Sequence, residues 1–383
     1  MTVQYRKLGR TGEEVSILGF GAMRLPVIGG DEGRIDEEAA TQLLHHAVER
    51  GVNYVDTAWS YHRGNSERWL GEVLEGGLRQ KVHLATKLPS WEIQTREDCD
   101  RYLNEQLARL KTPHIDFYLL HTLTRDWWNK LRDLGVLEFL DSALREGRIR
   151  YAGFSFHDDF SLFQEIVDAY DWSFCQIQYN YMDELYQAGR KGLEYAFERD
   201  LGVVVMEPLR GGTLAGRLPA DIVEIMEGHM EKRTPAEWAL RWVWNHPEVS
   251  LALSGMNSLD QLEENVATAS NAGPGSMSEE ELDVIRRVRE KYRERESVPC
   301  TVCGYCLPCP EGVNIPKIFS FYNEGAMFSD WKEPSGYYRD MMNPDERVPN
   351  CVECGDCEET CPQHIAIIEE LISAHRFLSG EDG

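Results

Sequence analysis

The sequence predicts an α/β fold: a (β/α)8 TIM barrel with a small N-terminal hairpin, followed by a small, mostly helical domain. Two observations support the barrel. Eight short apolar runs alternate with helical patterns, and they occupy a length close to the roughly 250 residues of such a barrel. A third observation marks the second domain, because eight of the ten cysteines in the 383-residue chain lie beyond residue 299. We therefore expect a barrel domain at residues 1–285 and a second domain at 286–383.

The eight apolar runs are continuous rather than alternating, which is typical of parallel strands covered on both faces. They span residues 17–23, 53–57, 82–87, 116–121, 151–155, 174–180, 203–208 and 251–255. Eight strand–helix alternations favour a closed barrel over an open sheet. Ahead of them, residues 5–8 and 14–17 flank a glycine-bounded turn and predict a short hairpin.

Helix signals lie between the apolar runs. Residues 36–50 begin with Asp36, a good N-cap, carry an apolar face, and are followed by Gly51. The dipeptide Thr234-Pro235 predicts the start of another helix, because proline is favoured at the first helical position. These helices supply the outer layer that the barrel prediction requires.

Polar side chains end three consecutive predicted strands. Asp56 ends the second, Lys87 the third and His121 the fourth, and Tyr61 follows Asp56 by five residues. Because strand ends and the loops beyond them meet at one mouth of a barrel, we expect these four residues to lie together. The ordinary pKa of tyrosine, about 10, is too high for good proton donation near neutrality, and a lysine cation should lower it. Asp56 would hold Lys87 charged, and His121 could donate to a carbonyl oxygen.

Eight cysteines form two runs. They are Cys300, Cys303, Cys306 and Cys309, and then Cys351, Cys354, Cys357 and Cys361. The second run has the C-x2-C-x2-C-x3-C-P spacing with which bacterial-type ferredoxins hold iron–sulfur clusters, and the first differs only in its last gap. Zinc is the weaker alternative. Disulfides need an oxidising compartment, and residues 1–5 open no apolar signal segment. We therefore predict two 4Fe–4S clusters in a cytoplasmic protein, with Cys99 and Cys175 as buried, neutral thiols.

Composition argues against two classes of partner. The chain has 65 acidic and 40 basic residues and a net charge of −25, so nucleic acid is not an expected ligand. No apolar stretch approaches the ~20 residues that a membrane span needs. The acidity most simply provides a soluble surface, and a basic redox partner is the less favoured interpretation.

Several motifs across residues 3–285 resemble those of the aldo-keto reductases. They are Leu18-Gly19-Phe20-Gly21-Ala22-Met23, Asp56-Thr57-Ala58-Trp59-Ser60-Tyr61, Asn65-Ser66-Glu67, Thr86-Lys87, Leu119-Leu120-His121, Gly153-Phe154-Ser155 and the segment 251–265. The resemblance implies that Asp56, Tyr61, Lys87 and His121 form a catalytic tetrad with Tyr61 as general acid. It also implies reduction of an aldehyde or ketone, or the reverse, with hydride from a nicotinamide bound without a Rossmann fold. The lack of a G-x-G-x-x-G motif after the first strand agrees with that.

The same resemblance implies which residues bind the nicotinamide nucleotide. Asp56 is one of them, and Ser155 and Gln176 match residues that hold the carboxamide of the nicotinamide. The other positions lie at the first strand end, along the pyrophosphate and at the adenosine end, where a helix start suits phosphate. They are Gly21, Ala22, Met23, Pro208, Leu209, Gly211, Gly212, Ser254, Gly255, Asn257, Gln261, Glu264 and Asn265.

Some positions depart from the family pattern. Phe156 replaces an asparagine, and Met206 replaces the aromatic residue that stacks under the nicotinamide. Gly255 and Gln261 align with basic residues that many relatives use for the 2′-phosphate of NADP, while Arg210 is basic but lies on another loop. NAD and NADP therefore both stay open, and a flavin is an alternative that we do not predict.

The tail resembles helical ferredoxin modules, because helical patches separate its cysteine runs. This resemblance implies that the fourth cysteine of each run binds the other cluster. Cys361 would then join Cys300, Cys303 and Cys306, and Cys309 would join Cys351, Cys354 and Cys357. Residues 278–296 predict a charged helix that leads into the tail.

Aromatic residues are candidates for covering the substrate site. In the aldo-keto reductases the segment after the last barrel helix folds over the mouth, and residues 331–338 could be that lid or could pack inside the tail. Trp59, Trp127 and Trp128 are candidates for the pocket wall. They would suit an apolar or ring-bearing small-molecule substrate.

Three functions remain open at this point, because nicotinamide passes electrons as a hydride pair whereas iron–sulfur clusters pass one at a time. The first is an NAD(P)-dependent carbonyl reductase with structural, sensory or partner-facing clusters. The second is a ferredoxin-fed reductase with a flavin or radical intermediate, and the third is a non-enzymatic electron-transfer or redox-sensing subunit. The complete tetrad favours an enzyme, and an electron-transfer protein is a possible partner of the tail.

Overall fold

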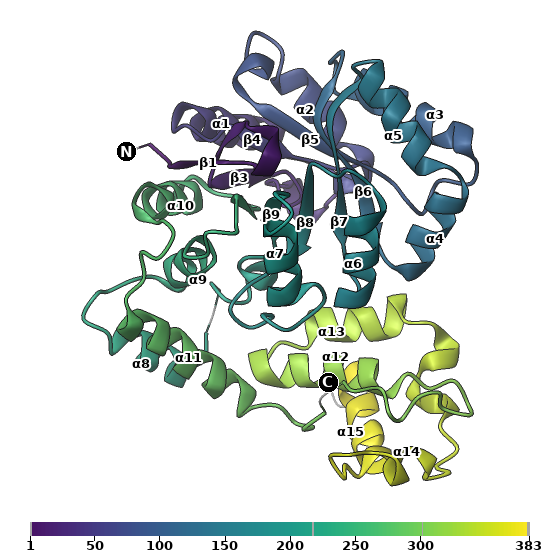
Figure 1. Cartoon of the computed structure of the whole chain (residues 1–383). Coiled ribbons are helices and arrows are strands. Elements are labelled where there is room, and N and C mark those ends of the chain that lie inside the picture. The colour runs from purple at the N-terminus through teal and green to yellow at the C-terminus, as the bar shows by residue number, and fades with distance from the viewer. Residues whose placement is uncertain (1, 217, 301, 381–383) are drawn as a thin grey trace. The chain divides into compact units, whose positions relative to one another are not determined.

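The computed structural model describes residues 2–216, 218–300 and 302–380. The chain divides into two compact units, which Figure 1 colours from purple to yellow along the sequence. The first unit comprises Met1–Gly216 and Arg233–Leu282, and the second comprises Arg217–Lys232 and Asp283–Gly383.

The first unit is a closed barrel whose described residues form eight parallel strands (Figure 1) in the order β10-β3-β4-β5-β6-β7-β8-β9. The strands are β3 Leu18–Gly21, β4 Tyr54–Asp56, β5 His83–Leu88, β6 Ile115–Leu123, β7 Ile149–Phe156, β8 Phe174–Gln178, β9 Gly202–Met206 and β10 Leu251–Ser254. Each overlaps one of the predicted apolar runs. The barrel prediction is therefore confirmed.

A hairpin closes the N-terminal end of the barrel. Strands β1 (Tyr5–Lys7) and β2 (Glu14–Ser16) pair antiparallel, as predicted. Leu8 and Val15 are fully buried in a cluster with residues such as Tyr54 and Phe174, which begin β4 and β8. Since the hairpin fills this end, the opposite end, at the carboxyl termini of the strands, is left for a site.

Helices surround the barrel. They are α1 Glu37–Glu49, α2 Ser66–Val73, α3 Arg96–Arg109, α4 Arg125–Asp133, α5 Val136–Arg145, α6 Phe160–Ala169, α7 Gly189–Phe197, α9 Pro235–Trp244 and α10 Leu259–Asn271. Asp36 caps α1 by accepting a hydrogen bond from the Ala39 N–H at 3.2 Å. Thr234 caps α9 in the same way, with the N–H of Glu237 at 3.1 Å. Both predicted helix starts are thus confirmed.

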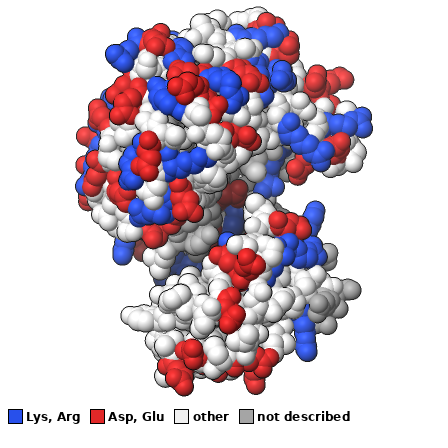
Figure 2. All heavy atoms as spheres, turned by 90° about the vertical axis from the view of Figure 1, so that its right-hand side faces the viewer, with Lys and Arg blue, Asp and Glu red and all other residues white. Residues whose placement is uncertain are grey.

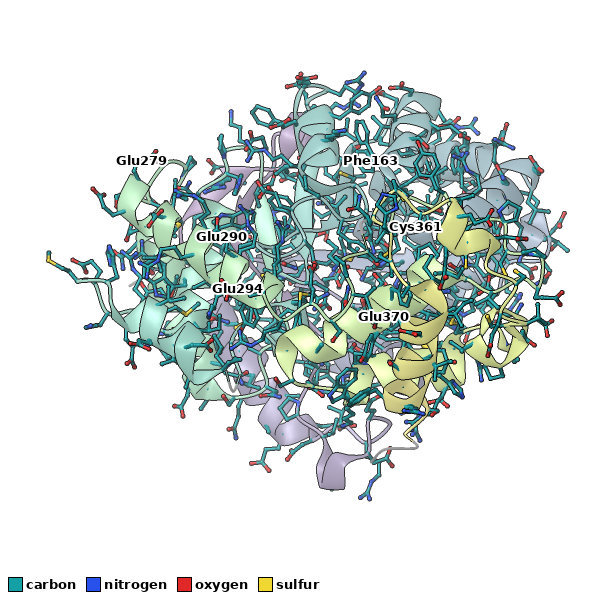
Figure 3. The ribbon with its side chains drawn as sticks, turned by 90° about the horizontal axis from the view of Figure 1, so that it is seen from below. Phe163, Glu279, Glu290, Glu294, Cys361 and Glu370 are labelled. Atoms are coloured by element: carbon teal, nitrogen blue, oxygen red, sulfur yellow. The ribbon has the colours of Figure 1, made fainter. Side chains whose placement is uncertain are left out.

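The described regular elements of the second unit are helical. They are α8 Ala220–Glu227, most of α11 Glu279–Arg293, α12 Ile315–Phe328, α13 Lys332–Gly336, a π-helical turn at Tyr337–Met341, short 3-10 turns, α14 Asp356–Glu359 and α15 Ile367–Ser379. Figure 3 labels Glu290 on α11 and Glu370 on α15. The apolar core of this unit lies between α12 and α15 and includes Phe319 and Leu371. Its helical character agrees with the prediction.

Residues 331–338 pack inside this second unit. The Trp331 ring stacks on Phe377 with centroids 4.8 Å apart, and Tyr338 is buried in the core. Residues 331–338 were expected either to cover the substrate site or to pack inside the tail, and these contacts support packing inside the tail.

Charges of both signs are interspersed on the face of the molecule shown in Figure 2. Within the described residues, each helix is too short or too polar to span a bilayer.

Candidate active site and cysteine sites

A buried lysine joins three of the four predicted catalytic residues. Lys87, on β5, is fully buried, and its ammonium donates to Asp56 Oδ1 at 2.7 Å. It also donates to the Thr57 carbonyl at 2.8 Å and to the Tyr61 hydroxyl at 3.3 Å. The adjacency of β4 and β5 brings these groups together, because Asp56 pairs with Ala85, two residues before Lys87.

His121 completes the group from β6. Its ring centroid lies 6.2 Å from that of Tyr61, with the rings nearly perpendicular. The Ser90 hydroxyl donates to the backbone carbonyl of His121 at 2.5 Å and fixes the backbone there. All four predicted residues therefore lie at the carboxyl end of the barrel.

Charge pairing keeps the lysine protonated. Burial alone would lower the pKa of Lys87, but Asp56 and Tyr61 outweigh burial, and the net pKa is raised. Burial raises the pKa of Asp56, while Lys87 opposes this rise. The pair is best described as an ammonium held by a carboxylate.

The pKa of Tyr61 corrects one expectation. Lys87 does lower the pKa of Tyr61, as predicted, but burial raises it by more, and the net pKa lies above 10. Desolvation disfavours the phenolate, and this cost depends on packing that the sequence does not reveal. Tyr61 is consequently a protonated donor at neutral pH, and Lys87 limits the rise in its pKa.

His121 is neutral. Burial, followed by the charge of Lys87 and then by His157, holds the pKa of His121 well below its usual range. A neutral imidazole keeps one N–H donor and one acceptor nitrogen. Near neutral pH, His121 can therefore donate a hydrogen bond but cannot act as a cation.

A buried polar network supports the strand that carries Lys87. Glu67, on α2, is fully buried and accepts from Thr86 at 2.7 Å and from Gln106 at 2.6 Å. Gln106, on α3, also donates to the backbone carbonyl of Lys87 at 3.0 Å. Arg109 pairs with Glu67 and lies 3.3 Å over the Trp59 ring. Glu67 belongs to the Asn65-Ser66-Glu67 motif, but the roles of Gln106 and Arg109 were missed because no sequence pattern distinguishes them within their helix.

The aromatic residues near the site differ in part from those expected. Trp59 is partly exposed, in the same loop as Tyr61. Trp91, whose ring centroid lies 5.1 Å from that of His121, was missed, although it follows Lys87 by only four residues. The expectation for Trp128 is wrong: this ring is completely buried, and its N–H donates to Glu165 at 3.0 Å. Its neighbour Trp127 is partly exposed and lies under Lys130.

The residues expected near the nicotinamide lie on adjacent strand ends. The Ala22 N–H donates to the Asp56 carbonyl at 2.8 Å. Ser155, on β7, accepts from the Thr122 N–H at 2.7 Å. Gln176 lies beside it on β8, paired in register. Gly21 ends β3, and the Met23 side chain is half exposed.

The expected adenosine-end residues lie on β10, on α10 and in the turn between them, and hydrogen bonds join some of them in pairs. Asn265 donates to the Ser254 hydroxyl at 3.1 Å, and Gln261 accepts from the Asn257 N–H at 3.0 Å. Glu264 accepts from the Thr234 hydroxyl. The expected pyrophosphate residues lie in and next to the turn after β9; they are Pro208, Leu209, Gly211 and Gly212.

Arg24 was missed by the sequence analysis. A Cβ atom added to Gly255 would lie 3.1–3.2 Å from the Arg24 side chain. Arg24 is exposed, and among the described residues its guanidinium makes no hydrogen bond or ion pair. The Arg24 side chain therefore lies beside Gly255, a position where the family pattern has a basic residue and this chain does not. Arg210 is instead held by Asp183, at 3.1 Å.

Three buried polar atoms at this end of the barrel have no hydrogen-bond partner among the described residues. They are Asp56 Oδ2, His121 Nδ1 and Gln176 Oε1. Buried polar groups are normally paired, so a polar ligand would satisfy them. A nicotinamide nucleotide and a carbonyl substrate fit this requirement.

The cysteines line two separate cavities in the second unit. The smaller, about 20 Å3, is lined by four cysteines that come from both runs, namely Cys300, Cys303, Cys306 and Cys361. The larger, about 200 Å3, is lined by Cys309, Cys351, Cys354 and Cys357, with Cys306 also at its wall. Cys361, labelled in Figure 3, is the most buried of the eight. Each cavity is thus lined by the first three cysteines of one run and the fourth cysteine of the other run, which matches the expected ligand sets.

The other two cysteines lie in the barrel. Cys99 and Cys175 are buried, as predicted, and burial raises the pKa of Cys99 to about 12. No group of three His, Cys, Asp or Glu side chains among the described residues is close enough to hold a single metal ion.

Comparison with known proteins decides the family. A sequence model of the Aldo/keto reductase family matches residues 17–287. The chain belongs to the aldo/keto reductase family. A 4Fe-4S dicluster domain matches residues 299–366, and this domain indicates iron–sulfur clusters. The chain is thus an aldo/keto reductase oxidoreductase that carries a C-terminal iron–sulfur domain.

Relatives match the barrel in both sequence and structure. The "Uncharacterized oxidoreductase YrpG" of Bacillus subtilis is 28% identical over 306 residues, covering 69% of this chain and 90% of that protein. Methylglyoxal reductase YeaE of Escherichia coli is 26% identical over 258 residues, covering 64% of this chain and 86% of that protein. The holo form of aldo-keto reductase AKR11C1 from Bacillus halodurans superimposes with a TM-score of 0.63 at 28% identity, covering 75% of this chain and 96% of that chain.

Proposed function

We propose that this aldo/keto reductase reduces an aldehyde or ketone to an alcohol, or catalyses the reverse, with Tyr61 as general acid. The observation that carries the proposal is the buried ammonium of Lys87, which contacts both Asp56 and the Tyr61 hydroxyl. A fully buried lysine needs such partners. It is therefore held where a negative charge on the Tyr61 oxygen would develop.

The protein's part in the reaction is proton delivery and charge stabilisation. Tyr61 gives its proton to the carbonyl oxygen of the substrate, and the phenolate that remains is stabilised by Lys87. Neutral His121 donates a hydrogen bond to the same oxygen. NAD(P)H, when bound, supplies the hydride. Asp56 keeps Lys87 charged and in place throughout.

The nucleotide would lie across the strand ends. We propose that Ser155 and Gln176 hold the carboxamide, since Gln176 Oε1 is buried without a partner among the described residues. The turn after β9 would follow the pyrophosphate, and the group formed by Ser254, Asn257, Gln261 and Asn265 would hold the adenosine. The remaining expected positions, including Gly255 and Glu264, border the same path.

We propose that Arg24 gives the site a preference for NADPH over NADH. Arg24→Ala should then weaken NADPH binding by about tenfold or more, because a charge-assisted hydrogen bond contributes about 1.5–3 kcal/mol. Binding of NADH should change little. Quenching of protein fluorescence measures both dissociation constants, and Arg68→Ala, an exposed arginine on α2, is the control. An equal change for both nucleotides would contradict the assignment.

We propose that the tail holds two 4Fe–4S clusters, one bound by Cys300, Cys303, Cys306 and Cys361. The other would be bound by Cys309, Cys351, Cys354 and Cys357. The two cysteine-lined cavities support this partition. Hydride chemistry in the barrel does not need single electrons, so the clusters would be structural or would serve a partner protein.

An anaerobic stopped-flow experiment tests whether carbonyl reduction in the barrel proceeds without electron transfer to the clusters. Mixing the protein with NAD(P)H and a panel of aldehydes and ketones should show oxidation of the nicotinamide while cluster absorption stays constant. Dithionite should bleach the clusters readily. Bleaching by NAD(P)H on the turnover timescale, or flavin bands in the isolated protein, would instead support a flavin- or radical-mediated reductase.

A further inference from the structure

The two cysteine-lined cavities differ in what surrounds them. The smaller is lined by cysteines and uncharged residues, such as Phe319 and Ile367. The larger also has Glu311 and Asp356 in its wall, together with three exposed apolar residues. These are Tyr305, Leu307 and Val352, which are 70%, 41% and 61% exposed. The larger cavity is therefore lined by acidic and exposed apolar residues, whereas no charged residue among those described lines the smaller one.

The charged residues that line the larger cavity, Glu311 and Asp356, are both acidic. Glu353 and Glu359 are exposed and close in sequence to the cavity-lining Asp356. Among the described residues, none of Glu311, Glu353, Asp356 and Glu359 forms an ion pair, and residues 302–316 and 348–375 contain no lysine or arginine. The acidic charge around Cys351, Cys354 and Cys357 is consequently not neutralised by a basic side chain from either segment.

We propose that the surface around the larger cavity docks a one-electron carrier protein that has a basic rim around its redox centre. The carrier exchanges electrons with the cluster at Cys309, Cys351, Cys354 and Cys357. Apolar contacts at the centre with charges around them are the anatomy of protein interfaces, and complementary charge speeds encounter and selects the partner. Cys354 is exposed at this surface, so the cluster would lie near the carrier. One electron would pass between the cluster and the carrier's own redox centre, so that one is oxidised as the other is reduced, without bond or proton changes.

The inference rests on the proposed cluster ligands but not on the proposed carbonyl chemistry. Basic cytochrome c is a suitable probe, because it carries lysines around an exposed haem edge. Calorimetry with the cluster-loaded protein should show binding at low ionic strength that weakens strongly as salt is added, since exposed charges are screened. An acidic ferredoxin should not bind under the same conditions.

Matched charge reversals locate the contact. Glu353→Lys/Asp356→Lys should weaken cytochrome c binding by about tenfold or more and slow its reduction by the dithionite-reduced protein. Glu333→Lys/Asp340→Lys changes the net charge equally at exposed positions in and after α13 and should leave both measurements within about twofold. Iron content shows whether each variant is loaded.

These measurements distinguish a failure of the docking-surface proposal from a failure of the carbonyl-reductase proposal. Equal effects of the two double variants, or binding that does not depend on salt, would overturn the docking surface. Carbonyl reduction by NAD(P)H should persist in Glu353→Lys/Asp356→Lys, because these residues belong to the tail. Lack of carbonyl reduction in the unmodified protein, with cytochrome binding intact, would overturn the reductase proposal alone.

Discussion

Replacing Tyr61 with phenylalanine should slow carbonyl reduction by about 10²–10⁴-fold, the usual contribution of general acid catalysis. The substitution removes the proton donor and keeps the ring. It also leaves Lys87 paired with Asp56 at 2.7 Å, so binding of the nucleotide should change little. Single-turnover rates with saturating NAD(P)H, together with nucleotide dissociation constants, would measure both expectations.

Tyr102→Phe is the matched control, because this tyrosine packs its ring against Trp59 in the same region. It should keep most of the activity. The pH profile of the unmodified enzyme adds a second check. Because the pKa of Tyr61 is raised and the pKa of His121 is lowered, neither group changes its protonation near neutral pH, and the rate of reduction should depend little on pH there. A near-normal rate for Tyr61→Phe would contradict the assigned role.

The barrel and the positions of Asp56, Tyr61, Lys87 and His121 were predictable because both follow from local patterns. Continuous apolar runs indicate parallel strands, and the carboxyl ends of such strands must meet. Asp56, Lys87 and His121 lie at or near the carboxyl ends of neighbouring strands, so their positions in the sequence place them together. The helix starts at Asp36 and Thr234 were equally local, since a cap needs only its own first turn.

Other properties depend on three-dimensional packing. The net pKa of Tyr61 follows from burial, and Trp128 on α4 is completely buried, with its N–H donating to Glu165 on α6. The approach of Arg24 to Gly255 joins two loops that are far apart in sequence, although their strands β3 and β10 are neighbours in the barrel. A pattern in a single sequence carries no direct signal of such contacts.

In the tail, too, some features were predictable from the sequence and others needed the structure. The cysteine spacing pointed to iron–sulfur clusters, and the dicluster match to residues 299–366 supports this. The first run departs from the ferredoxin spacing at its last gap, so spacing alone left the partner of Cys309 open. The cavities favour the exchanged arrangement, because Cys361 lines the same cavity as Cys300, whereas Cys309 lines the other.

Removal of Cys361 should cost the protein about half of its iron, leaving about four of about eight atoms, because one of two 4Fe–4S clusters would lose a ligand. Cys361 also belongs to the buried core of the second unit. Cys361→Ala should therefore lower the thermal stability of that unit, since ligand binding contributes to the folding of small metal domains. Iron and sulfide analysis of protein reconstituted without oxygen gives the count, and circular dichroism follows unfolding.

Double variants test the partition of ligands between the clusters. If Cys300 and Cys361 bind one cluster, Cys300→Ala/Cys361→Ala should retain the same four or so iron atoms as either single variant. Cys300→Ala/Cys309→Ala should lose both clusters, because its two cysteines line different cavities. Cys99→Ala, which removes a buried thiol of the barrel, should keep all of the iron. The reverse result for the two double variants would show that each run binds its own cluster, and an unchanged iron content in Cys361→Ala would remove Cys361 from the ligands.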